Sequence, residues 1–129
     1  MFENLDIFRM SHAMAVHAGQ KQAVSAQNVA NADTPGYRAQ DLPAFKETYQ
    51  ATPAAPSMLR ATRARHLNAS VTGQQFVAID DKQSPSAPNG NSVSLETEML
   101  RSAAAKSQHD RALAIYKASL SILRTTIGR

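Results

Sequence analysis

Histidine is the residue type in this chain whose spacing most directly tests for a metal site. His12 and His17 are five residues apart, whereas two ligands on one face of a helix occupy positions i and i+4. His66 and His109 have no acidic or histidine partner at a ligand spacing. The chain has no cysteine, which excludes disulfides and thiolate ligands. We therefore predict no metal site.

Adjacent carboxylates are the second candidate for chemistry. Asp80 and Asp81 point to opposite faces of an extended chain, so they are poorly placed to share one substrate, and a solvated turn explains them better. The five glycines are scattered and form no phosphate-binding loop. We predict no catalytic residue, no bound cofactor and no enzymatic activity.

The formal charge of +4 raises the question of nucleic-acid binding. Most of the excess is spread along the last segment, which is typical of a solvated helix face. A denser basic cluster contains no aromatic residue for base stacking; it consists of Arg60, Arg63, Arg65 and His66. We therefore predict that nucleic acid is not a partner.

The N-terminus does not resemble a cleaved secretion signal. Glu3 and Asp6 stand where such a signal carries basic residues, and no uninterrupted apolar run is long enough to cross a bilayer. We predict no direct membrane insertion. The chain is expected to be either cytosolic or exported without a cleaved signal peptide.

The elements that must position these side chains fall into three segments: 1–32, 33–91 and 92–129. With 129 residues, 5% aromatics and no Trp, the chain favours one domain of packed helices over a thick core. A helix is predicted over 4–30, with a thin apolar stripe of Leu5, Phe8, Ala15, Val16, Ala23, Ala26, Val29 and Ala30. All six prolines lie in 33–91, which predicts an extended segment with little β structure; its one strand candidate is QQFVAID, residues 74–80.

A second long helix is predicted in 92–129. Ser92 or Ser94 is the expected N-cap, and Glu96 and Glu98 suit the first turn. An apolar seam with alternating steps of four and three includes Leu95, Met99, Leu113, Tyr116, Leu120, Leu123 and Ile127. A second row, Ala112, Ile115, Ser119 and Ile122, runs beside it. Together they form a face too wide for one partner helix, so we interpret the seam as an assembly contact.

The stretch NVANADTPGY, residues 28–37, ends the first helix abruptly. Asn31 tolerates the left-handed conformation that terminates helices, and Pro35 with Gly36 favours a type II turn. Asp33 and Thr34 are expected to hydrogen-bond nearby backbone groups, and Tyr37 to anchor the chain against a packed surface. Turn chemistry alone would also account for these residues.

A longer run, AQNVANADTPGYRAQDLPAF (26–45), resembles the signature of bacterial flagellar rod and hook proteins. Within that family, the segment NGNSVSLETEM and the ending ILRTTIG resemble the B-type proximal-rod proteins. Ser92 and Gly19 depart from the usual pattern. The residues that carry the turn motif are Asn28, Asn31, Asp33, Thr34, Pro35, Gly36 and Tyr37.

The resemblance implies a mainly α fold in which the two terminal helices pack as a coiled-coil inner domain. It implies a structural subunit that assembles helically with itself and other rod proteins, and so transmits torque between the MS ring and the distal rod. The implied further partners are the ring's rod adaptor and the flagellar type III export apparatus, and the implied location is the periplasmic rod of the basal body.

Two alternatives stay open at the level of sequence. One is a C-type proximal-rod protein, which shares the turn but is expected to end differently. The other is a cytosolic helical adaptor or export chaperone, which should fold fully as an isolated subunit.

Overall fold

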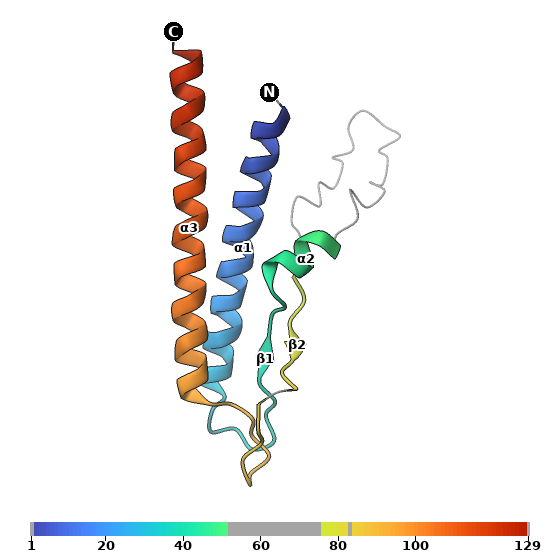
Figure 1. Cartoon of the computed structure of the whole chain (residues 1–129). Coiled ribbons are helices and arrows are strands. Elements are labelled where there is room, and N and C mark those ends of the chain that lie inside the picture. The colour runs from blue at the N-terminus through green and yellow to red at the C-terminus, as the bar shows by residue number, and fades with distance from the viewer. Residues whose placement is uncertain (1, 52–75, 83, 129) are drawn as a thin grey trace, which may run out of the picture.

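The computed structural model describes residues 2–51, 76–82 and 84–128 (Figure 1). Two long helices dominate it: α1 spans Phe2–Ala30 and α3 spans Leu95–Ile127. Between them lie β1 (Gln40–Asp41), α2 (Phe45–Ala51) and β2 (Ile79–Asp80). The predicted mainly α fold with two packed terminal helices is confirmed. The basic cluster at residues 60–66 lies outside the described residues.

Helices α1 and α3 lie side by side and run antiparallel, so that both chain ends are at the same end of the molecule (Figure 1). Their contact is built from small buried side chains at seven-residue spacing. These are Ser11, Ala18 and Ser25 on α1, opposite Ala112, Ala105 and Glu98 on α3. Small side chains let the axes of the two helices approach closely. Glu98 is the one long side chain among these six residues.

Polar and aromatic contacts fix the register of this pair. Ser25 Oγ donates to the Glu98 carbonyl at 2.9 Å, and Gln22 Nε2 donates to Ser102 Oγ at 2.9 Å. Further along, the rings of Phe8 and Tyr116 meet edge to face at 5.2 Å. In an antiparallel pair of helices, the residue numbers of two facing positions have a constant sum, which is about 124 here. The start of α1 therefore lies opposite Ile122, and the part of α3 after Ile122 extends beyond α1 (Figure 1).

The apolar stripe expected on the first helix packs against α3 only in part: Phe8 meets Tyr116, but the C-terminal half of the stripe does not form the buried face. Ala23, Ala26, Val29 and Ala30 are exposed, whereas the serines and Asn28 are buried. The buried face was missed because a hydrophobic pattern gives no weight to small hydroxyl residues, even though they pack closely and donate hydrogen bonds along it.

The caps of α3 follow its sequence signals. Ser94 is the N-cap, and its Oγ accepts from the Thr97 N–H at 3.5 Å. Ser92, the other predicted cap, instead uses its Oγ to accept from the Ala39 N–H at 2.9 Å. At the other end the Gly128 N–H donates to the Arg124 carbonyl at 2.9 Å.

The middle segment adds a two-stranded antiparallel ladder, in which Gln40 pairs with Asp80 and Asp41 with Ile79. The strand predicted over 74–80 is therefore shorter than expected: residues 74–75 lie outside the described part, and Phe76 precedes the strand. Helix α2 was not predicted. It forms where Phe45 and Tyr49, one helical turn apart, bring their rings to 5.2 Å.

Candidate functional site: the asparagine clamp and the face of α3

Asn91, just before α3, closes the end of α1. Its Nδ2 lies 2.9 Å from the Asn31 carbonyl, 2.7 Å from that of Ala32 and 2.9 Å from that of Thr34, and it donates to all three. Its Oδ1 accepts from the Val93 N–H at 2.7 Å. All three carbonyls belong to the turn that follows Ala30, the last residue of α1, so this side chain holds that turn from a position sixty residues along the chain.

Asn28, within the last turn of α1, holds the chain that leaves the turn. It is fully buried, at 0% exposure. Its Nδ2 donates to the Gln40 carbonyl at 2.7 Å, and its Oδ1 accepts from the Gln40 N–H at 3.0 Å and from the Tyr37 hydroxyl at 3.3 Å. The amide thus pairs with β1 as a neighbouring strand would. We call Asn28 and Asn91 the asparagine clamp.

The turn between these contacts has the predicted type II geometry. Gly36 has φ +73°, and the Tyr37 N–H donates to the Thr34 carbonyl at 3.3 Å. A second glycine turn packs on it: Gly90 has φ +80°, and a Cβ there would lie 3.3 Å from the Gly36 Cα. The Gly36 N–H donates to the Asn89 carbonyl at 3.0 Å, so the two turns are bonded together.

The remaining motif residues have lesser or local contacts. Asn31 Nδ2 donates to the Gln27 carbonyl at 2.8 Å, and Thr34 Oγ1 donates to Asn31 Oδ1 at 3.3 Å. Asp33 and Pro35 are exposed. The motif therefore divides into clamp and turn residues that hold the chain, and surface residues beside them. Sequence reasoning missed the partner of the motif, although the run NGN at 89–91 carries turn-forming residues that could have indicated it.

An ionic cluster around Arg101 joins the same end of α3 to the ladder. Its Nη1 donates to Glu98 Oε1 at 2.8 Å and its Nη2 to Asp81, while Nε lies 3.6 Å from Asp41 Oδ2. Burial acts to lower the pKa of Arg101, but the bond to Asp81 and the neighbouring carboxylates raise it overall. Asp80 is exposed and Asp81 is largely buried, so the expectation that both lie in a solvated turn is wrong.

His17 is a packed side chain in this structure. It is 1% exposed, its ring meets Phe76 at 4.8 Å and Phe45 at 5.6 Å, and its Nε2 lies 2.9 Å from the Pro43 carbonyl. Burial lowers its pKa, although the bond to Pro43 opposes the shift. Within the described ranges, no group of three or more His, Asp or Glu residues could hold a metal ion.

The predicted assembly seam lies beside the row that faces α1. Leu95, Met99, Leu113, Tyr116 and Ile127 are exposed, and Leu120 and Leu123 are half-buried. Met99 is 71% exposed and Ile127 79%. The face is not a membrane span: among the described residues, no helix combines the length and the apolar character needed to cross a bilayer.

Two comparisons with known proteins place this arrangement. A family model described as "Flagella basal body rod protein" matches residues 17–38, which contain both Asn28 and the glycine turn. The "Flagellar basal body rod protein FlgB" of Agrobacterium fabrum is 29% identical over 128 residues, covering 97% of this chain and 95% of the relative. The chain is thus similar to flagellar basal body rod proteins, within residues 17–38 and over nearly its whole length.

These matches identify the chain as a structural subunit of the basal body rod, not an enzyme. It functions in flagellar motility by assembling with other rod components. The adaptor and C-type alternatives are not favoured by these matches. Asn28 and the turn at Gly36 fall within the matched region, whereas Asn91 lies outside it.

Proposed function

We propose that this rod subunit belongs to the proximal rod, where it connects the MS ring and its rod adaptor to the distal rod. The near full-length similarity to the flagellar basal body rod protein FlgB of Agrobacterium fabrum supports this position, together with the B-type features at residues 89–99 and 122–128. Its mechanism is mechanical: repeated contacts between subunits transmit torque, and no covalent bond changes.

The observation that carries the proposal is an exposed apolar face on a helix whose base is rigidly held. The clamp and the Arg101 cluster fix one end of α3, while the seam from Leu95 to Ile127 remains largely uncovered by α1. Exposed apolar surface of this extent on one helix is typical of a contact with other subunits. In this proposal the seam is the assembly contact, and residues 1–32 and 92–129 form the inner domain.

The segment 33–91 packs between neighbouring subunits in this proposal. Export occurs through the flagellar type III apparatus, on an unfolded chain and without a cleaved signal, and the subunit reaches the periplasmic part of the rod. The similarity to a flagellar basal body rod protein supports this route.

The test is the location of the chain in purified basal bodies. Cells that lack the subunit are expected to build the MS ring without a rod above it, and the restored wild-type chain should reconstitute rod and motility. Density for the subunit should then lie next to the ring in a cryo-EM reconstruction. Density confined to the distal rod, or a complete rod without this chain, would contradict the proposal.

A further inference from the structure

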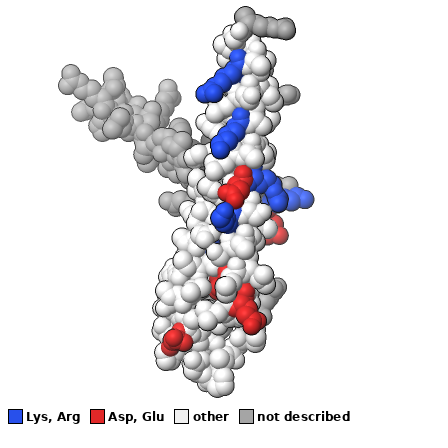
Figure 2. Space-filling model, turned by 90° about the vertical axis from the view of Figure 1, so that its left-hand side faces the viewer, with Lys and Arg blue, Asp and Glu red and all other residues white. Residues whose placement is uncertain are grey.

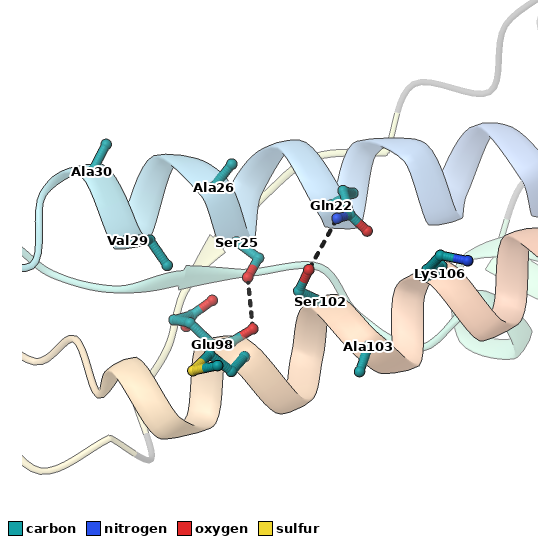
Figure 3. A pocket seen from close by; sticks show the side chains of 10 residues that line it. Gln22, Ser25, Ala26, Val29, Ala30, Glu98, Ser102, Ala103 and Lys106 are labelled. Atoms are coloured by element: carbon teal, nitrogen blue, oxygen red, sulfur yellow. Dashed lines mark hydrogen bonds between the residues drawn. The ribbon is translucent and has the colours of Figure 1, made fainter.

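A groove between α1 and α3 opens beside the asparagine clamp. It has a volume of about 520 Å³ and is lined from α1 by Val29 and Ala26 and from α3 by Met99 and Ala103. Val29 and Glu98 point into the space between the helices (Figure 3). Its walls are mostly apolar, yet none of the described segments of the chain fills it.

One atom in this groove is buried without a partner. Glu98 is 1% exposed, and although its Oε1 accepts from Arg101, its Oε2 has no hydrogen-bond partner among the described residues. Buried carboxylate oxygens are normally satisfied, so the position favours a donor that arrives from outside the chain. Lys106, at the far side of the groove, is 3.3 Å from Asp110 and thus already paired.

The opposite end of the molecule presents exposed apolar and basic side chains. The last turns of α3 extend beyond α1 and present Ile122, 59% exposed, and Ile127, 79% exposed. From Arg111 to Ile127 the helix contains three basic residues and no acidic residue. Figure 2 shows basic side chains toward this end and acidic ones toward the clamp.

We propose that the C-terminal end of α3 of one copy docks in the clamp-side groove of a second copy. Ile122 and Ile127 then cover the apolar walls, and Arg124 supplies the donor that Glu98 Oε2 lacks. The two surfaces are different, so the contact is heterologous and continues from copy to copy instead of closing into a two-fold dimer. The inference rests on the proposed helical assembly and specifies which surfaces of two copies meet.

The natural absence of cysteine makes a disulfide test clean. Two single variants, Ala103→Cys in the groove and Ile127→Cys at the helix end, are expressed together in cells that lack the native subunit, and basal bodies are oxidised. Within one chain these positions are about 36 Å apart along α3, from the helical rise of ~1.5 Å per residue. That distance is far beyond disulfide reach, so any bond joins two copies.

The expected result is a disulfide-linked dimer from the mixed single variants and a ladder of oligomers from a chain carrying both cysteines. The matched control is Ala104→Cys in place of Ala103→Cys; Ala104 is exposed on α3 but does not line the groove, so its dimer yield should fall at least tenfold. A second pair, Val29→Cys with Ile122→Cys, is scored in the same way in case one variant does not incorporate.

Three results would overturn the inference: no mixed dimer from either pair in motile cells, dimers from Ala103→Cys alone, or disulfide-free photo-cross-linking at Met99 that captures a different rod protein. The proposed function is judged separately, by whether the wild-type chain restores the rod. A strain that is motile without the cross-link would therefore reject the docking mode and leave the rod function intact.

Discussion

The two ends of the α1–α3 pair differ in the kinds of side chain that they bury and expose. At the clamp end, polar side chains are buried: Asn28, Asn91 and Glu98 are each at most 3% exposed. At the distal end, Ile122 and Ile127 are exposed; Met99 and Leu100 are exposed near the clamp as well, so the buried polar cluster is what distinguishes the clamp end. Soluble proteins usually bury apolar groups and expose polar ones. The reversed pattern here separates two tasks, which are holding the shape of the subunit and making contacts with other subunits.

The clamp end shows how a chain with a small core can hold a defined shape. Each clamp asparagine replaces backbone partners that a helix end or a strand edge lacks, and Arg101 neutralises the carboxylates around it. The apolar surface is thereby not needed to fix the junction. In our proposal it remains available for contacts with other subunits.

The largest effect is expected from placing a charge on the distal end. Leu123→Asp should abolish motility while the subunit is still made, because an unpaired carboxylate buried at a subunit contact costs several kcal/mol and recurs in every copy. Motility in soft agar and basal-body yield provide the measurement. Ala118→Asp is the control, since Ala118 is exposed and lies away from both the seam and the α1-facing row. Normal swimming with Leu123→Asp would show that the seam is not an assembly contact.

The clamp should govern stability instead. Asn91→Ala removes the donor that the carbonyls of Asn31, Ala32 and Thr34 share in the turn after α1, and also the acceptor of the Val93 N–H; a polar group left without a partner costs about 1–3 kcal/mol. We expect the free energy of unfolding in urea to fall by about 2–4 kcal/mol, given that the carbonyls share one amide. Gln27→Ala, on an exposed residue of the same helix, should change it by less than about 0.5 kcal/mol. Equal midpoints for the two variants would show that the clamp does not stabilise the fold.

Replacing glycine by alanine should change the stability of the subunit in opposite directions at two positions. Gly36→Ala places a Cβ at φ +73° and should destabilise the subunit by about 1 kcal/mol. Gly19→Ala lies in the exposed middle of α1, with no atom within 4 Å of the new Cβ, and should stabilise it by up to about 1 kcal/mol. Thermal melting of both variants is the measurement. A shift of the same sign would mean that the turn relaxes freely.

The smallest effect concerns pH. Because burial lowers the pKa of His17 below its ordinary value of 6.5, the unfolded chain binds more protons as the pH falls through that value. Stability should therefore be fully present above about pH 6.5 and decrease below it; Lys21 and Asp41, the nearest charged groups, act in opposite directions. Melting temperatures from pH 7.5 to 5 should depend less on pH for His17→Gln than for the native chain. Identical slopes would contradict the role of burial.

Much of this fold could be predicted from sequence, because its signals are local. The ends of both helices, the N-cap at Ser94 and the type II turn at Gly36 each follow from neighbouring residues. The face of α3 that meets α1 could not be predicted, since Ala105, Ala112 and Glu98 form a row without a hydrophobic signature. Asn91 and Asp81 were missed because their partners are remote along the chain, and spacing shows only local relations.

The contrast between the two ends is tested most directly by hydrogen exchange along the chain. In the isolated subunit, backbone amides of residues 28–42 and 91–105 should exchange slowly, while those after Ile122, where α3 extends beyond α1, exchange fast, because isolated helices depend on packing for most of their stability. In assembled basal bodies both regions should be protected. Equally slow exchange along the whole of α3 in the isolated subunit would contradict the account, because the distal end would then be stable without its neighbours.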